Sequence, residues 1–137
     1  METSARPAED APTDAFVADV FATGCTSRAT LEDVAGKWGI LALLALDESD
    51  FRFNALRRRV EGVSEKMLSQ TLQTLERDGM VVREVRSAIP PRVDYSLTPL
   101  GSRVAGQLRG LADLLESSTD DVDAARSAFD ARAGRAR

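Results

Sequence analysis

Histidine is absent from this chain of 137 residues, and cysteine occurs only once, at Cys25. Without histidine, a Ser-His-Asp catalytic triad cannot be assembled, and one cysteine alone cannot supply a Cys/His zinc site. A single cysteine also excludes a disulfide within the chain, which suits a reducing cytoplasm. The acidic residues fall mainly in turns, helix ends and the termini, so no pair of carboxylates is placed for general acid and base chemistry. We therefore expect neither an enzyme nor a metal or other cofactor.

Long apolar segments are also missing. The longest, Trp38–Leu46, is far shorter than the roughly 18 residues that a membrane-spanning helix needs, so it predicts a buried core helix. The first residues, Met1–Asp14, carry four acids and one arginine, and they lack the basic and apolar regions of a secretion signal. These absences predict a cytoplasmic protein without a membrane partner.

The chain has no overall excess of positive charge, because 18 Lys and Arg residues stand against 22 Asp and Glu residues. The basic residues are nevertheless concentrated between Arg52 and Arg92, where nine of them accompany five acids. That segment has a net charge of +4 and the rest of the chain one of −8, which together give the net charge of −4. Since phosphate neutralisation by Lys and Arg supplies much of the affinity for DNA, this segment is the candidate nucleic-acid contact.

Periodicity and turn residues predict one mainly helical domain with a small β-hairpin, preceded by a disordered arm at residues 1–12. Helices are expected at Thr13–Gly24, Arg28–Val34, from Lys37 through Leu46, Phe53–Val60, Glu65–Asp78, and from Thr98 to about Glu116. In the second of these helices, Leu31 and Val34 are expected to point inward. Strands are expected at Met80–Arg86 and Arg92–Leu97, joined by a hairpin tip at Ser87–Pro91. The ordered domain then spans residues 13–116, and residues 117–137 add a short helix and a loose tail.

The helix from Glu65 to Asp78 carries the most informative pattern. Ser64 is a good N-cap residue, and Leu68, Leu72 and Leu75 follow the spacing of one buried helix face. On the opposite face, the same periodicity gathers four polar side chains: Lys66, Gln70, Gln73 and Arg77. The order helix, turn, helix, strand, loop, strand, helix is that of a winged helix-turn-helix, in which this helix would enter the major groove.

This arrangement assigns roles to the polar residues. Lysine can donate to guanine, and glutamine can pair with adenine, so we expect the base-reading residues to be Ser64, Lys66, Ser69, Gln70 and Gln73. Arginines around the helix would hold the DNA backbone, and the candidates are Arg52, Arg57, Arg58, Arg77, Arg86 and Arg92. A polar helix face is more often simply solvated, and an arginine cluster often serves solubility; Arg59 is expected to pair with Glu61 or the acidic turn Asp47–Asp50. The agreement of several weak signals on one geometry favours DNA binding.

Several motifs resemble those of HxlR-type regulators. They are Gly36-Lys37-Trp38, Phe51-Arg52-Phe53-Asn54, the run Gly62–Leu68, the run Leu75–Gly79, and the run Pro90–Gly101. The resemblance covers the chain from about Cys25 to Gly101. It implies a homodimeric winged helix-turn-helix regulator of transcription, with dimer contacts from the N-terminal and long C-terminal helices. A two-fold dimer would read an inverted-repeat operator in double-stranded DNA.

The resemblance also gives Cys25 a possible role as a sensor of thiol-reactive oxidants or electrophiles. The proline that usually follows this cysteine in the family is replaced by Thr26. Arg28 and the positive end of a helix beginning at Ser27 would favour the thiolate, although a small buried filler is the competing interpretation. Two further modes of action are compatible with the sequence: control by a small-molecule ligand at the dimer interface, and a winged helix used only for contact with another protein.

Overall fold

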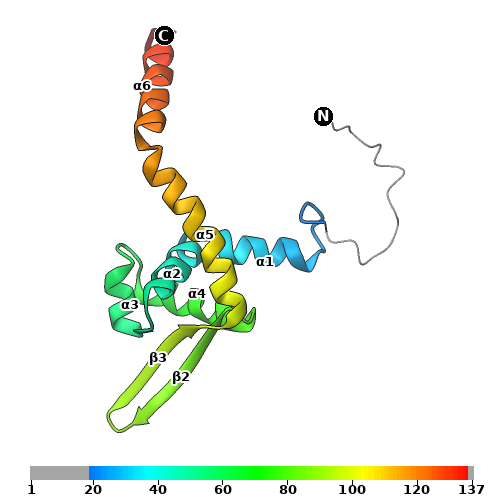
Figure 1. The fold of residues 1–137 in the computed structure, drawn as a ribbon, viewed down its shortest axis with the longest axis vertical. Coiled ribbons are helices and arrows are strands. Elements are labelled where there is room, and N and C mark those ends of the chain that lie inside the picture. Colours follow the sequence, from blue (N-terminus) through cyan, green and yellow to red (C-terminus); the bar gives the residue numbers. More distant parts are fainter. Residues whose placement is uncertain (1–18, 136–137) are drawn as a thin grey trace, which may run out of the picture.

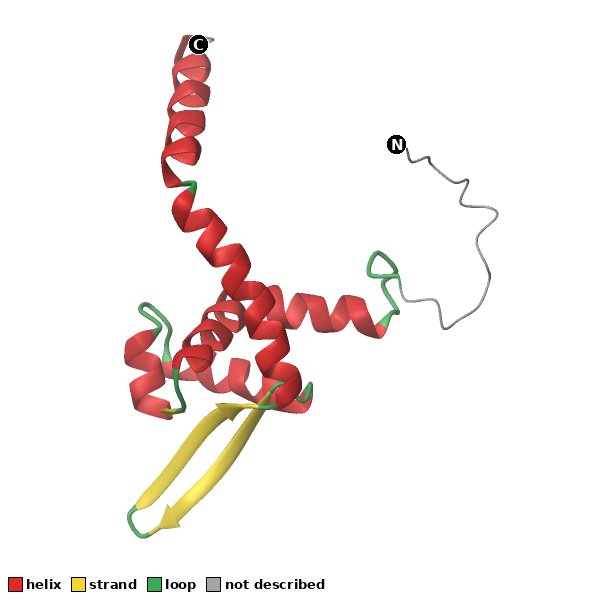
Figure 2. Ribbon diagram, viewed as in Figure 1, coloured by secondary structure: helices red, strands yellow, loops and turns green. Residues whose placement is uncertain are grey.

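The computed structural model describes residues 19–135 (Figure 1). Its elements follow the order α1 (Thr26–Ala35), α2 (Lys37–Glu48), β1 (Phe51–Arg52), α3 (Phe53–Arg59), α4 (Glu65–Arg77), β2 (Val81–Ala88), β3 (Pro91–Leu97), α5 (Pro99–Ser117) and α6 (Thr119–Arg135). Figure 2 shows a helical body from which the β2–β3 hairpin projects as a wing. The mainly helical fold with a small hairpin wing is the one that the sequence predicts.

The core forms around α2, which the sequence predicts as the central helix because it is apolar on almost every side. Leu43 of α2 is fully buried, and it belongs to one cluster with Leu56 of α3 and the three leucines of α4, which are Leu68, Leu72 and Leu75. Trp38 is only partly buried and packs against this cluster from the start of α2. The same leucine face that fixes α4 in the core therefore leaves its other face outward.

Backbone caps determine where α4 begins and ends. The Ser64 hydroxyl accepts a hydrogen bond from the backbone N–H of Met67 at 3.0 Å, which satisfies a donor at the start of the helix. At the other end, Gly79 adopts φ = 77°, a left-handed conformation that suits glycine. The Ser64 cap is the signal used above to predict the helix, although its last residue is Arg77 and Asp78 serves as the C-cap.

The sheet contains a strand that the sequence pattern does not predict. The short strand β1 pairs with β3, so that the strand order is β1-β3-β2, with Phe51 opposite Tyr95 and Arg52 opposite Asp94. The hairpin is also longer than expected, because Ser87 pairs with Arg92 and Ala88 with Pro91. The predicted hairpin tip at Ser87–Pro91 is therefore wrong, and only Ile89 and Pro90 lie between the strands.

The long helix α5 starts as predicted, with Thr98 as its N-cap and Pro99 at its first turn. The Thr98 hydroxyl accepts from the backbone N–H of Gly101 at 2.9 Å and donates to the carbonyl oxygen of Gly79 at 2.6 Å. A Cβ atom at Gly101 would overlap the carbonyl of Met80. This close approach attaches the start of α5 to the end of α4.

Three expectations about the ends of the domain need correction. The disordered arm at 1–12 and most of the predicted helix Thr13–Gly24 lie outside the described residues, while residues 20–24 form turns and not a helix. Helix α1 starts at Thr26, so its N-cap is Cys25 and not Ser27, and Leu31 is 49% exposed where the sequence predicts it inward. Helix α6 continues to Arg135, where a short helix and a loose tail are expected. Terminal helices carry few apolar residues, so periodicity alone places their limits poorly.

Candidate nucleic-acid interface

The outward face of α4 carries the side chains that the sequence pattern assigns to base reading. Lys66, Gln70 and Gln73 are exposed, Ser69 is half-buried, and Ser64 lies at the start of the helix as its cap. Because α4 is 13 residues long and its leucines are buried, these polar groups are held on a rigid element. Such a face has the donors and acceptors that base edges can pair with.

The polar face borders two different surroundings. On one side, Ser69 and Gln73 line a groove of about 450 Å³ between α4 and the wing, together with Glu76 and Arg83. On the other side, Gln70 lines a separate hollow of about 290 Å³ with Lys37 and Trp38 of α2. Lys37 places its ammonium group 4.6 Å from the centre of the Trp38 ring. The helix wheel groups Gln70 with Gln73, but the neighbouring elements separate them into two depressions.

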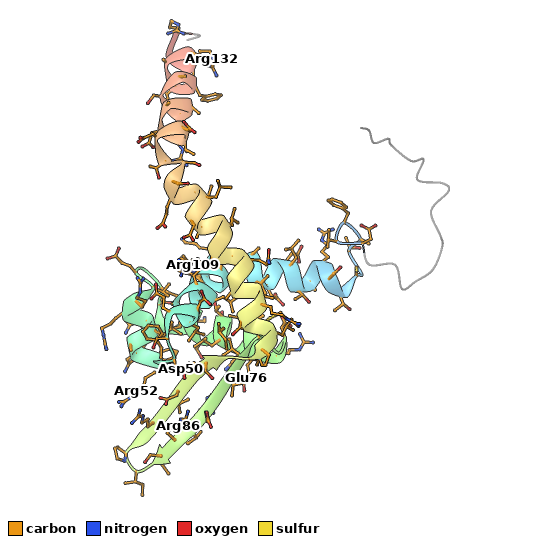
Figure 3. The ribbon with its side chains drawn as sticks, viewed as in Figure 1. Asp50, Arg52, Glu76, Arg86, Arg109 and Arg132 are labelled. Carbon is orange, nitrogen blue, oxygen red and sulfur yellow. The ribbon has the colours of Figure 1, made fainter. Side chains whose placement is uncertain are left out.

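A second groove gathers arginines from three elements at the base of the wing. Arg52 of β1, Arg58 of α3 and Arg92 of β3 line a hollow of about 460 Å³ together with Asp50 and Asp94. Figure 3 shows Arg52 and Asp50 between α3 and the wing. No ion pair involves Arg52 or Arg58 among residues 19–135. We refer to Arg52, Arg58 and Arg92 below as the arginine cluster.

The wing arginines are held by acids of the hairpin itself. Arg86 lies 3.1 Å from Glu84 and 3.2 Å from Asp94, and Arg92 lies 3.6 Å from the other oxygen of Asp94. Asp94 is half-buried, with only 17% of its side chain exposed, and it holds both guanidinium groups on the surface of the wing. Figure 3 shows Arg86 on the wing. Contact with a phosphate would have to compete with these pairs.

The remaining arginines divide into two groups. Arg57 of α3 lies 3.7 Å from Glu65 in the first turn of α4, and Arg77 is exposed at the end of α4. Arg59 instead donates to both carboxylate oxygens of Glu48, at 2.9 and 2.6 Å, which places it at the acidic end of α2 and not at Glu61. Its guanidinium holds the pKa of Glu48 below its usual value. Arg59 is thus part of the α2–α3 connection.

Arg83 is a residue to which the sequence pattern assigns no role. It lies on β2 opposite Tyr95, and it lines the groove that contains Gln73. A signal for it exists, because Arg83 follows the buried Val81 by two residues and so lies on the same face of its strand. The groove between α4 and the wing therefore has a cation of its own.

Cys25 lies at the start of α1, half-buried, and is the only cysteine of the chain. Its sulfur lies 3.0 Å from the hydroxyl oxygen of Ser27. This hydrogen bond is the largest cause that lowers the pKa of the thiol to about 7, and backbone groups of Asp19, Ser27 and Arg28 add to it. The guanidinium of Arg28, which the sequence pattern predicts to favour the thiolate, is engaged instead with Glu32 at 3.1 Å and the carbonyl of Phe21 at 3.0 Å.

Two carboxyl groups meet between α1 and the end of α4. Asp78, the C-cap of α4, has one carboxyl oxygen, Oδ2, that is buried without a hydrogen-bond partner. Burial first, and then the neighbouring Asp33 of α1, raise the pKa of Asp78 to about 6, while Arg77 acts in the opposite direction. A carboxyl of this kind holds its proton more readily in the folded chain than in the unfolded one.

Apolar side chains remain exposed on the helices that lie away from the wing. The most exposed are Leu31 of α1, Leu111, Leu114 and Leu115 of α5, and Phe129 of α6. Figure 1 shows that α1 and α6 extend from the body in different directions. Within residues 19–135, no helix has both the length and the apolar character needed to cross a membrane.

Comparison with known proteins gives consistent results. A model of the HxlR-like helix-turn-helix family matches residues 33–123. The HTH-type transcriptional regulator YtfH of Escherichia coli is 48% identical over 108 residues, which cover 79% of this chain and 86% of YtfH. The solved structure of YtfH from Salmonella typhimurium superimposes with a TM-score of 0.75 at 46% identity, and covers 80% of this chain and 98% of that one.

A redox regulator is also among the similar structures. HypR in its reduced form superimposes with a TM-score of 0.66 at 33% identity, and covers 72% of this chain and 97% of HypR. The winged-helix fold, the extent of the family match and the identity to YtfH agree with one another. The chain belongs to the HxlR-like family of helix-turn-helix transcriptional regulators.

Proposed function

We propose that this regulator binds an inverted-repeat operator in double-stranded DNA as a homodimer, with α4 in the major groove of each half-site. The observation that carries the proposal is the outward face of α4, where Lys66, Gln70 and Gln73 are exposed on a helix whose other face is buried. Base edges in the major groove present the acceptors and donors that these side chains match. The two half-sites would lie about one helical turn apart.

The arginines surround this face on the side of the wing. The arginine cluster offers three guanidinium groups at one hollow, and Arg57, Arg77 and Arg86 extend the positive surface. Phosphate contacts position a protein without reading sequence, so these residues set affinity and its dependence on salt. The ion pairs of Arg86 and Arg92 with Asp94 keep both side chains ordered on the wing before DNA arrives.

Dimerisation is supported by the exposed apolar residues. Leu111, Leu114 and Leu115 are each about half exposed in the single chain, as is Leu31 of α1. Burial of apolar area against a second copy would stabilise a two-fold dimer. Sedimentation equilibrium measures this association, and a monomer at micromolar concentration would contradict it.

Selection from a random duplex library tests the whole proposal. The protein is expected to enrich an inverted repeat, and Gln73→Ala or Gln70→Ala is expected to change the preferred base at one position of each half-site, by about tenfold or more. Gln107→Ala, an exposed glutamine of α5, is the matched control and should change nothing. Absence of any enriched sequence would leave a winged helix that contacts only other proteins.

Thiol sensing is a second candidate function, favoured by the geometry at Cys25. The hydrogen bond to Ser27 and a pKa of about 7 make the thiolate available at neutral pH. HypR, a redox regulator by its description, shares the fold. Modification of Cys25, at the start of α1, would change the distance between the two α4 helices of the dimer and so the affinity for the operator.

The test is a titration of operator binding with a quinone or diamide. Loss of affinity in the wild type and not in Cys25→Ser supports sensing by this thiol. An equal response of both proteins would exclude it, and a response of neither would turn attention to a small-molecule ligand at the dimer interface.

A further inference from the structure

The two depressions beside α4 follow opposite flanks of its outward face. The α4 residues that line the groove under the wing are Ser69, Leu72, Gln73 and Glu76, and those that line the hollow beside α2 are Met67, Gln70, Thr71 and Thr74. Each set has the spacing i, i+3, i+4 and i+7, so each forms one stripe along the helix. At about 100° per residue, the outward stripe with Lys66 and Arg77 lies between the centres of these two stripes. The wing therefore forms one wall beside the outward face, and the end of α1 with the start of α2 forms the other.

Lys37 supplies the positive charge of the wall formed by α1 and α2. It is the only cation among the residues that line this hollow, and its side chain is exposed. Within residues 19–135 it has no ion pair, and its ammonium group instead lies 4.6 Å from the centre of the Trp38 ring. Two acids share the hollow, but Glu32 is paired with Arg28 at 3.1 Å and Asp33 faces the C-cap of α4. The described part of the chain therefore leaves the charge of Lys37 without a carboxylate partner.

The main chain that carries Lys37 is held firmly against the body. Gly36 alone separates α1 from α2, and a Cβ atom at Gly39 would overlap the carbonyl oxygen of Asp33. The end of α1 thus packs directly on the first turn of α2. Trp38, the next residue, packs against the core cluster that also contains the leucines of α4. Lys37 is consequently attached to a rigid position beside α4, and only its side chain is free to move.

A helix in the major groove has a phosphate backbone on each side. An α-helix with its side chains is about 10–12 Å across, and the groove is about 12 Å wide. When α4 lies along the groove, the walls on its two flanks therefore meet the two backbones that border the groove, which belong to opposite strands. The wall under the wing has Arg83 and, at the base of the wing, the arginine cluster. The opposite wall has Lys37.

We infer that Lys37 binds a backbone phosphate of the DNA strand opposite to the one that faces the wing. An ammonium group and a phosphodiester oxygen form a charge-assisted hydrogen bond, and the Trp38 ring keeps the lysine side chain beside α4. This inference rests on the proposed function and deepens it, because it brings α2 into the interface. Phosphates carry no sequence information, so Lys37 sets affinity and centres α4 between the two backbones, but it does not select bases.

Substitution of Lys37 tests the contact in the full-length protein, with the inverted-repeat duplex enriched from the random library as the probe. Lys37→Met removes the charge and keeps an unbranched side chain over Trp38. It is expected to weaken binding and to lower the slope of log affinity against log salt by about one for each half-site. Lys37→Arg keeps the charge and is expected to bind nearly as the wild type does. Arg126→Met is the control for net charge, because it lies on α6, which projects away from the wing in Figure 1.

Base preference separates this role from that of Gln70 in the same hollow. The ranking of operator variants is expected to be the same for Lys37→Met as for the wild type, because a lost phosphate contact weakens binding to all sequences alike. Gln70→Ala is expected to change that ranking at one position of each half-site. A changed ranking in Lys37→Met would assign this lysine to a base edge and overturn the phosphate contact.

Duplexes with a neutral methylphosphonate at one phosphate at a time locate the contact. The wild type is expected to lose affinity at positions on both strands of a half-site. Lys37→Met is expected to become insensitive at one of these positions, and Arg58→Ala at a position on the other strand. If both variants became insensitive on the same strand, the arrangement with one wall for each strand would be overturned.

The contact is also overturned if Lys37→Met keeps the wild-type slope, or if Lys37→Arg binds no better than Lys37→Met. Thermal unfolding of each variant recognises a loss of affinity that comes from weaker packing of Trp38, since such a loss would lower the melting temperature. A wild type without affinity for any duplex would overturn the proposed function and this contact together. Wild-type binding with an unchanged slope in Lys37→Met would overturn the contact alone.

Discussion

Arg59 of α3 donates two hydrogen bonds to the carboxylate of Glu48 at the end of α2. Its neighbour Arg58 belongs to the arginine cluster and has no ion pair among residues 19–135. Adjacent arginines of the same helix therefore have different surroundings. One connects two helices of the body, and the other faces the hollow at the base of the wing.

This difference predicts the salt dependence of DNA binding. In the proposed function Arg58 contacts a phosphate, so Arg58→Ala is expected to lower the slope of log affinity against log salt by about one. Arg59→Ala is the matched control, because Arg59 is already engaged with Glu48; it is expected to keep the slope and to lower the melting temperature slightly. Fluorescence anisotropy with a labelled operator over a salt series measures the slope. Equal slopes for Arg58→Ala and the wild type would remove Arg58 from the interface.

The hydrogen bond between Cys25 and Ser27 predicts the pH dependence of thiol reactivity. Since the thiolate is the nucleophile, the alkylation rate with iodoacetamide is expected to rise with pH and to reach half its maximum near pH 7. Ser27→Ala removes the largest cause of the lowered pKa, so its midpoint moves upward. Thr30→Ala removes a hydroxyl that donates to the Thr26 carbonyl of the same helix and should leave the midpoint unchanged. A wild-type midpoint as high as that of Ser27→Ala would contradict a role for this hydrogen bond.

The raised pKa of Asp78 predicts how stability varies with pH. The folded chain holds the proton up to about pH 6, whereas the unfolded chain releases it near the ordinary value of 3.8. Between these values the folded state binds more protons, so this group makes the free energy of unfolding fall as pH rises from about 4 to about 6. Asp78→Asn removes the charge, and is expected to be more stable than the wild type at pH 7 but to lose that advantage near pH 4.

Thermal unfolding at several pH values measures this effect, and Glu76→Gln on the exposed side of α4 serves as the control. If Asp78→Asn and the wild type differed by the same amount at pH 4 and pH 7, the carboxyl of Asp78 would not be the group responsible. Asp33→Asn is expected to reduce the pH dependence, since Asp33 contributes to the raised pKa.

Substitution by alanine is expected to have opposite effects on stability at two glycines of α5. A Cβ at Gly101 would overlap the carbonyl of Met80, so Gly101→Ala must displace backbone and is expected to cost about 1–3 kcal/mol or more. A Cβ at Gly110 meets nothing within 4 Å, so Gly110→Ala is expected to stabilise the helix by up to about 1 kcal/mol. Urea denaturation compares the two variants. A Gly101→Ala protein as stable as the wild type would mean that α5 does not approach Met80 so closely.

The sequence predicts the central elements well because their signals are local. The cap at Ser64, the leucines at 68, 72 and 75, and Thr98-Pro99 each specify a helix boundary or face within a few residues. The strand β1 is missed because two residues show no alternation, and its existence depends on pairing with Tyr95 and Asp94, far along the chain. The length of α6 is missed because no apolar stripe against the core marks it.

In the candidate site, too, local features are predicted from the sequence and contacts between distant elements are not. Periodicity places Lys66, Gln70 and Gln73 outward, and the structure agrees. Which neighbours they meet depends on α2 and the wing, so a helix wheel cannot separate Gln70 from Gln73 or bring Arg83 to the groove. The direct partners of Arg28 are similarly set by the folded chain, whereas the pairing of Arg59 with Glu48 is the one that the sequence predicts with the acidic turn. The roles of the α4 residues in DNA binding remain predictions for the experiments above.

The pairing of β1 with β3 has a consequence for how the wing can vary in length. Because β3 is the middle strand, the positions of Phe51 and Arg52 are set at the base of the hairpin, opposite Tyr95 and Asp94. Residues added or removed in matched pairs around Ile89 and Pro90 would change only the outer reach of the hairpin. Such changes in length would leave the spacing between Arg52 and α4 as it is.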